Sequence, residues 1–242
     1  MSIQMMLLGV GAVDTKTYVD DVFSSYLYDA DGTAVTINNG IDFAGKGGML
    51  WTKGREVSRQ HTMMDTVRGK LKYLDSSANT AEGSFEGSYG LQSFNSNGYS
   101  FGSDYTWENA GGDMVNWSFR KATGFFTICS WTGTGVARTI AHDLGSVPGA
   151  IWIKCTSDSE SWACYHKATG ANYITFLNSN SEGGAGNDPW NSTTPTATHF
   201  SLKTDDQVNG LNKTYVAYIF AGGGSTASTA RSVNFDGSND YL

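Results

Sequence analysis

The chain has 242 residues, a formal net charge of −7 at pH 7 and a pI of about 5.0, and its Lys and Arg residues are scattered. Because phosphate binding requires clustered basic side chains, nucleic acid is excluded as a partner. Charged residues are only 16% of the chain and glycines number 30, so the surface is expected to consist largely of Ser, Thr, Asn and Gly.

The first 21 residues are predicted to form an assembly arm. Their apolar run is far shorter than the ~20 residues of a membrane span, and no basic residues precede it as they would in a signal peptide. An apolar surface left in water would aggregate, so we expect the arm to pack against another protein or a sister subunit. A strand docked on the first domain and an unusual targeting segment are the alternatives. The residues expected to make the assembly contact are Ile3, Met5, Met6, Leu7, Leu8 and Val10.

Most of the following sequence occurs twice. Met49–Lys53 returns as Ala150–Lys154, and Val115–Phe119 returns as Val216–Phe220, both at an offset of 101 residues. A period of this length indicates duplicated domains rather than a solenoid.

We therefore predict two domains of about 100 residues, a common domain size. Repeat 1 is expected to span residues 22–122, and repeat 2 residues 123–223. The duplication also provides an internal comparison, because a residue kept in both copies is expected to serve the fold.

Each copy contains short candidate strands separated by turns. In Tyr215–Phe220 two apolar sets alternate, which is typical of a strand with one face on a core. Asp31-Gly32 and Asn97-Gly98 are hairpin or turn signals. We predict an all-β fold of two tandem, jelly-roll-like β-sandwiches. The face retained in both copies is expected to form the core, through Trp51, Val115, Trp117, Phe119, Trp152, Val216, Tyr218 and Phe220.

The densest polar cluster of the sequence contains His61, Asp65 and Arg68. A His with a carboxylate and an Arg can do acid–base work. The second copy replaces these residues, in the same order, with Trp162, His166 and Thr169. Neither copy adds a Ser or Cys nucleophile at a sharp turn or a pair of acids. We therefore expect a salt-linked structural turn here and no catalytic residues.

Metal and cofactor sites are not expected. Asp29–Gly32 resembles the start of a calcium loop, but its counterpart Thr132–Gly135 has no carboxylate, so a β-turn is expected. The three cysteines, Cys129, Cys155 and Cys164, form no CxxC motif. We expect the three cysteines to pack as small apolar side chains without a disulfide framework, which suits folding in a reducing cytoplasm.

Aromatic residues in Gly- and Asn-rich loops are candidates for stacking on sugar rings. They are Tyr105, Trp107 and Trp190. The alternative is that they cap the cores or pack against neighbouring subunits.

After the repeats, residues 224–231 are predicted to be a flexible linker. Residues 232–242 contain Phe235-Asp236-Gly237 and then Asp240-Tyr241-Leu242, and they resemble the first strand of a laminin-G or concanavalin-A-like lectin domain. This resemblance implies a longer protein whose next domain is lectin-like.

A second resemblance covers nearly the whole chain. It rests on Trp152–Lys154, Asp65–Gly69, Asn97–Tyr99, Gly102-Ser103 and Val115–Phe119. Together these resemble the repeated domain of virion structural and tail-fibre proteins of marine bacteriophages, cyanophages among them. In that family the domain has no known function, so the resemblance implies a virion setting and no chemistry.

The resemblance leads to the expectation of a non-enzymatic structural component of a phage virion. It would be the virion-proximal part of a tail fibre, attached to other virion proteins through the arm and homotrimeric by analogy with phage fibres. The missing distal domain would bind a host-surface glycan, and no membrane insertion is expected. Alternatives are a capsid decoration or knob protein and a stand-alone carbohydrate-binding lectin. A glycan depolymerase ranks last, because its two carboxylates about 5–10 Å apart are not found.

Overall fold

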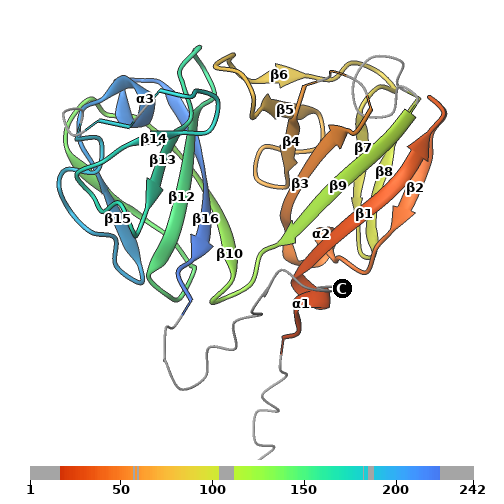
Figure 1. The fold of residues 1–242 in the computed structure, drawn as a ribbon, viewed down its shortest axis with the longest axis horizontal. Helices are drawn as coiled ribbons and strands as arrows, with labels where there is room; N and C mark the ends of the chain where they lie inside the picture. The colour runs from red at the N-terminus through yellow and green to blue at the C-terminus, as the bar shows by residue number, and fades with distance from the viewer. Residues whose placement is uncertain are drawn as a thin grey trace, which may run out of the picture.

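Alternating apolar residues and frequent turns fold this chain into antiparallel strands throughout (Figure 1). The computed structural model describes residues 17–223, except 57, 59, 104–111, 182 and 185–187. Most of the predicted arm, with Ile3, Met5, Met6, Leu7, Leu8 and Val10, lies outside the described residues, as do the predicted linker and the lectin-like strand.

Repeat 1 pairs a six-stranded sheet with a three-stranded sheet. The larger sheet runs in the order β1 (Phe23–Ala30), β9 (Gly112–Arg120), β3 (Gly48–Gly54), β4 (Thr62–Asp65), β5 (Lys72–Asp75) and β6 (Gly83–Ser84). The smaller sheet runs in the order β2 (Val35–Asn38), β8 (Gly98–Phe101) and β7 (Leu91–Asn95). Two single-turn helices, α1 (Val19–Val22) and α2 (Phe43–Lys46), flank the sheets.

Repeat 2 follows the same plan. Its larger sheet runs in the order β10 (Phe126–Thr132), β16 (Thr214–Ala221), β12 (Pro148–Cys155), β13 (Ala163–His166) and β14 (Thr175–Phe176). Its smaller sheet pairs β11 (Arg138–Ala141) with β15 (His199–Leu202), and α3 (Asp206–Asn209) lies beside it in sequence. The register repeats too, since Trp51 faces Trp117 across β3 and β9 as Trp152 faces Tyr218 across β12 and β16.

Each repeat has its own core between its two sheets. In repeat 1 this core includes Leu50, Met64 and Tyr99, all fully buried. In repeat 2 it includes Ile151 and Ile219, again fully buried. The prediction of an all-β fold of two sandwiches is confirmed.

A third apolar cluster lies between the two repeats, and it contains most of the residues predicted to form the core. Val216 and Tyr218 are fully buried in it, and Trp51, Phe119, Trp152 and Phe220 pack against it. Val115 is also buried, and Trp117 contacts Trp51. The retained face does form an apolar core, but this core lies between the repeats and not inside either sandwich.

The opposite face of each final strand fills the sandwich interior instead. In β16 that face carries Tyr215, Ala217 and Ile219, so both faces of the strand are buried. In β9 it carries Asn116 and Ser118, which are buried although polar. The Asn116 side-chain amide donates to the Tyr99 hydroxyl at 2.8 Å, and such pairing makes the burial of a polar group tolerable.

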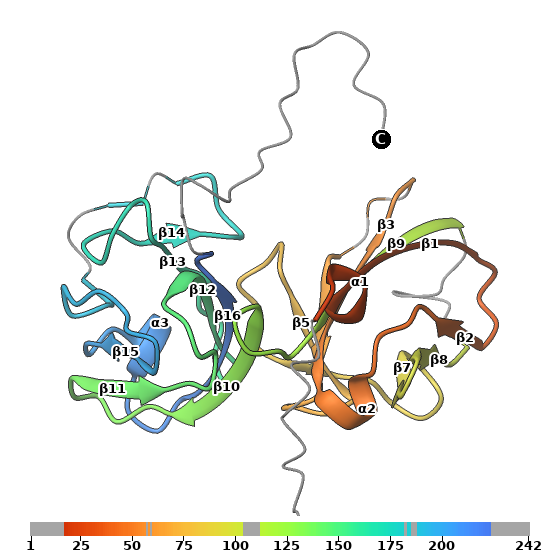
Figure 2. The ribbon, with the colours of Figure 1, turned by 90° about the horizontal axis from the view of Figure 1, so that it is seen from below.

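The two lobes stand side by side, and Figure 2 shows them from below. Helix α1 and the end of β16 lie at the same end of the molecule, the lower end in Figure 1. The described chain therefore enters and leaves its two lobes at one end. None of the helices in the described part of the chain has the length and apolar character needed to cross a membrane.

Candidate functional site

Equivalent residues of the two repeats contact each other at the interface. The rings of Trp51 and Trp152 are 5.9 Å apart between centroids, and those of Phe119 and Phe220 are 5.7 Å apart. Each pair is related by the 101-residue offset of the duplication. Contact between equivalent positions is the signature of an isologous, two-fold interface. The repeats are therefore packed as an approximately two-fold pair within one chain.

A buried polar cluster crosses this interface on one side. The Asp65 carboxylate lies 2.5 Å from the Arg68 guanidinium, and Arg68 also pairs with Glu82 at 3.2 Å. From repeat 2, the Tyr218 hydroxyl donates to Asp65 at 2.8 Å and accepts from Arg68 at 3.0 Å. The Arg68 side chain is 6% exposed and that of Asp65 is fully buried.

Local structure holds the two charges of this cluster in place. The other carboxylate oxygen of Asp65 accepts the backbone N–H groups of Val67 and Arg68, both at 2.9 Å, which fixes the turn after β4. Burial alone would lower the pKa of Arg68, but Asp65 and Glu82 raise it above its ordinary value. Burial raises the pKa of Tyr218 well above its ordinary value. The cluster thus holds a charged Arg and a neutral Tyr hydroxyl.

The predicted salt-linked turn is present, although His61 does not join it. His61 lies near Lys53 and Asp75. Its partial burial, and to a smaller extent the positive charge of Lys53, lower its pKa. The hydrogen bonds of Asp65 and Arg68 are directed at each other, at Glu82, at the backbone and at Tyr218. This arrangement fits a structural contact between repeats rather than acid–base chemistry. The sequence did not reveal the Tyr218 partner, which lies 150 residues from Arg68.

Three further hydrogen bonds tie the β5–β6 segment of repeat 1 to repeat 2. The Trp162 indole donates to the Asp75 carbonyl at 2.9 Å, and the Glu82 N–H donates to the Thr156 carbonyl at 3.0 Å. The Lys154 ammonium reaches the Asn79 carbonyl at 3.4 Å. Lys154 is fully buried, and this burial lowers its pKa to about 8.

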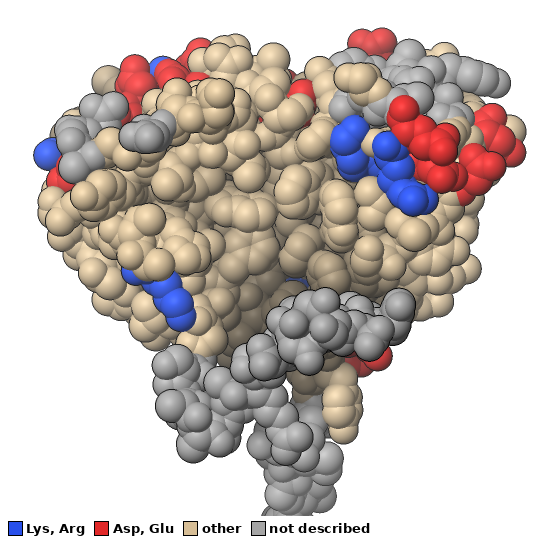
Figure 3. Space-filling view, in the orientation of Figure 1, with Lys and Arg blue, Asp and Glu red and all other residues tan. Residues whose placement is uncertain are grey.

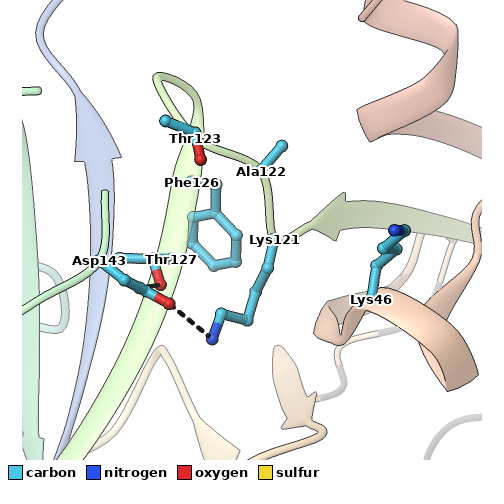
Figure 4. A pocket seen from close by; sticks show the side chains of 7 residues that line it. All are labelled: Lys46, Lys121, Ala122, Thr123, Phe126, Thr127 and Asp143. Atoms are coloured by element: carbon cyan, nitrogen blue, oxygen red, sulfur yellow. Dashed lines mark hydrogen bonds and ion pairs between the residues drawn. The ribbon is translucent and has the colours of Figure 1, made fainter. Parts of the chain in front are cut away.

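A polar pocket of about 210 Å³ lies where the chain passes from one repeat to the other (Figure 4). The Asp143 carboxylate pairs with Lys121 at 3.5 Å and accepts a short hydrogen bond from Thr127. Partial burial tends to raise the pKa of Asp143, but the hydrogen bond from Thr127 and the charge of Lys121 lower it below its ordinary value. Lys46 also lines the pocket. Its one carboxylate is neutralised by a neighbouring lysine, so the pocket does not present a pair of catalytic acids.

The proposal of Trp190 as a glycan-stacking residue is wrong. Trp190 is 1% exposed, its indole donates to the Tyr173 carbonyl at 2.9 Å, and its ring packs 5.7 Å from Tyr165. It belongs to the core of repeat 2. The other two candidates, Tyr105 and Trp107, lie outside the described residues.

The calcium-like sequence forms the predicted turn. Asp31 accepts hydrogen bonds from the N–H and the hydroxyl of Thr33, at 2.9 and 2.6 Å. Across the described residues, His, Cys, Asp and Glu side chains form no group of three that could hold a metal ion. Cys129, Cys155 and Cys164 are free thiols, and burial raises the pKa of Cys129 and Cys164 to about 12.

Comparison with known proteins gives one family. Residues 19–238 match a family described as a domain of unknown function, DUF7483, so a single family unit covers both repeats. No curated protein and no solved structure matches the chain.

Proposed function

This chain belongs to the DUF7483 family, whose description assigns no function, and we propose that it is a non-enzymatic structural component of a phage virion. It would act as a two-lobed unit attached by the segments at its ends. The observation that carries the proposal is the interface between the repeats. Apolar packing and a buried ion cluster join the lobes, as expected of a load-transmitting part.

The surface composition also supports a structural role. Only 16% of the residues are charged, and the face in Figure 3 is largely uncharged. Asp65 and Arg68 at the interface are used in bonds to each other and to Tyr218 of repeat 2. The resemblance of the sequence motifs to marine phage proteins supplies the virion setting, which is an argument by analogy.

The positions of the first and last described elements bear on where the unit would sit. In a virion-proximal tail-fibre segment the chain would continue from one lobe end toward a distal tip. Here α1 and the end of β16 lie at the same end of the molecule (Figure 1). Because both elements lie at one end, a knob or capsid decoration whose shared lobe end faces the particle is the second candidate beside the tail fibre.

Immunogold electron microscopy tests the proposal. Antibodies raised against the folded chain are applied to particles purified from a lysate in which the chain is produced. Label on the tail supports the fibre placement, and label on the capsid supports the knob. Unlabelled particles beside abundant free chain in the same lysate would overturn the virion role.

A further inference from the structure

Each large sheet carries one straight row of side chains across its interface face. In repeat 1 the strand register aligns Ser25, Trp117, Trp51, Met63 and Leu74. In repeat 2 it aligns the equivalent residues Ile128, Tyr218, Trp152, Cys164 and Thr175. The contact between Trp51 and Trp152 places the middle of one row against the middle of the other.

The two rows are closed on one side of this contact and open on the other. On the closed side Met63, Leu74 and Tyr218 are fully buried and share the apolar cluster. On the open side Ser25 is exposed and Trp117 is only partly buried. In repeat 2 the half of the row away from Tyr218 runs from Trp152 through Cys164, which is buried in the same cluster, to Thr175, which is partly buried. Figure 3 shows a hollow, uncharged surface between the lobes.

The tryptophans differ in their hydrogen bonding. The indoles of Trp51, Trp131, Trp162 and Trp190 each donate to a protein oxygen between 2.9 and 3.1 Å. The indole N–H groups of Trp117 and Trp152 have no acceptor among the described residues. Both side chains are only partly buried, and neither indole nitrogen is among the buried polar atoms that lack a partner, so these two donors are available to a ligand.

We propose that the open side, which we call the tryptophan groove (Ser25, Trp117, Trp51, Trp152 and Thr175), binds a neutral saccharide. Indole rings offer flat apolar faces for the C–H face of a sugar ring, and their N–H groups donate to its hydroxyls. Ser25 adds a hydroxyl that can donate or accept. Neither row contains a charged side chain, so the chemistry favours an uncharged ligand.

The groove is formed jointly by the repeats. Trp117 and Trp51 come from repeat 1, with ring centroids 5.2 Å apart, and Trp152 comes from repeat 2. Sites made of apolar rings with a few convergent polar groups often lie where domains meet. On the closed side, the hydrogen bonds of Tyr218 to Asp65 and Arg68 join the two lobes. These bonds hold the lobes at a fixed relative position, and the groove on the open side depends on that position.

Sugar binding in the tryptophan groove does not depend on where the chain sits in a particle. Absence of sugar binding would leave the immunogold result unaffected, and unlabelled particles would leave the groove unaffected. The two proposals can therefore fail separately.

The experiment screens the full chain against an array of neutral mono- and oligosaccharides and then titrates the hits by tryptophan fluorescence. We expect Trp117→Ala and Ser25→Arg each to weaken binding about tenfold or more, because one removes a ring face and the other fills the groove. Val136→Arg is the matched control, since Val136 is 62% exposed in repeat 2 and absent from both rows. Its binding is expected to be unchanged.

A third variant separates binding from folding. Trp117→Phe keeps a ring but loses the N–H donor, so we expect an intermediate loss of affinity with an unchanged unfolding midpoint. No binding to any neutral glycan by the folded chain would overturn the proposal. So would binding that Trp117→Ala and Ser25→Arg leave unchanged, or that depends only on residues 224–242.

Discussion

Trp51 and Trp152 hold the same position in the two repeats and contact each other edge to face, with ring centroids 5.9 Å apart. When equivalent residues of two repeats contact each other, the contact lies on the axis of an internal two-fold symmetry. The polar cluster breaks this symmetry, because Asp65 and Arg68 are replaced by His166 and Thr169 in repeat 2. The apolar part of the interface therefore serves any pairing of repeats, whereas the polar part matches repeat 1 with repeat 2.

Removing the Tyr218 hydroxyl should weaken the link between the repeats. Tyr218→Phe keeps the ring but deprives Asp65 of a donor and Arg68 of an acceptor at a buried position. We expect the free energy of unfolding to fall by about 1–3 kcal/mol, the cost of an unsatisfied buried polar group. Urea denaturation at pH 7 measures it. The control is Tyr173→Phe, at a residue that is 45% exposed, and its effect should stay within about 0.5 kcal/mol. Equal effects would contradict this role.

Trp190 should act as a core residue. Trp190→Ala opens a cavity beside Tyr165 and leaves the Tyr173 carbonyl without its donor. We expect a loss of about 3–5 kcal/mol in the free energy of unfolding, measured by denaturant titration. Leu211→Ala, at a side chain 67% exposed, should change it by less than about 0.5 kcal/mol. A near-neutral Trp190→Ala would restore the idea of a surface platform.

Gly98 should not tolerate a side chain. It is the first residue of β8, directly after the tight turn from β7, with φ of +138°, and an added Cβ would collide with the backbone carbonyl of Ile37. Gly98→Ala should cost about 3 kcal/mol of stability, because backbone cannot move aside as a side chain can. Gly40→Ala is the comparison, since Gly40 has φ of +86° but open space around it. There the cost should be about 1–2 kcal/mol, from the left-handed conformation alone. Equal melting temperatures for the two variants would refute the steric argument.

The sequence predicted the fold class and the duplication because both depend on local signals. Period-two alternation and turn dipeptides such as Asn97-Gly98 define strands without knowledge of their neighbours. The salt link between Asp65 and Arg68 was also within reach, since the two residues are three positions apart.

The role of the retained face could not be predicted in this way. In β16 both faces are apolar, so alternation does not say which face points into the sandwich. Retention in both copies selected the interface face, because a two-fold contact requires the same residues on both sides. The prediction that Trp190 lies on the surface failed for a related reason. Its Gly- and Asn-rich neighbours indicate a loop, but they do not show that the side chain packs into the core of repeat 2.

Lys154 gives the chain a stability that depends on pH. Its ammonium is fully buried and donates to the Cys155 carbonyl at 2.8 Å, and burial lowers its pKa to about 8 from an ordinary value of 10.5. Between these two values the unfolded chain binds more protons than the folded chain. The free energy of unfolding attributable to Lys154 therefore rises as the pH rises through about 8.

The measurement compares the wild-type chain with Lys154→Met by urea denaturation at pH 7, 8 and 9. Between pH 7 and 9 the free energy of unfolding of the wild type should rise by about 1 kcal/mol relative to that of the variant, because Lys154 loses its proton at a lower pH in the folded chain than in the unfolded chain. Cys129 and Cys164, whose pKa values burial raises to about 12, favour unfolding as the pH rises. They are present in both proteins, so their effect cancels in the difference. Parallel stability curves for the two proteins would mean that Lys154 keeps its proton throughout this range, and that its contacts with the carbonyls of Asn79, Cys155 and Asp158 outweigh its burial.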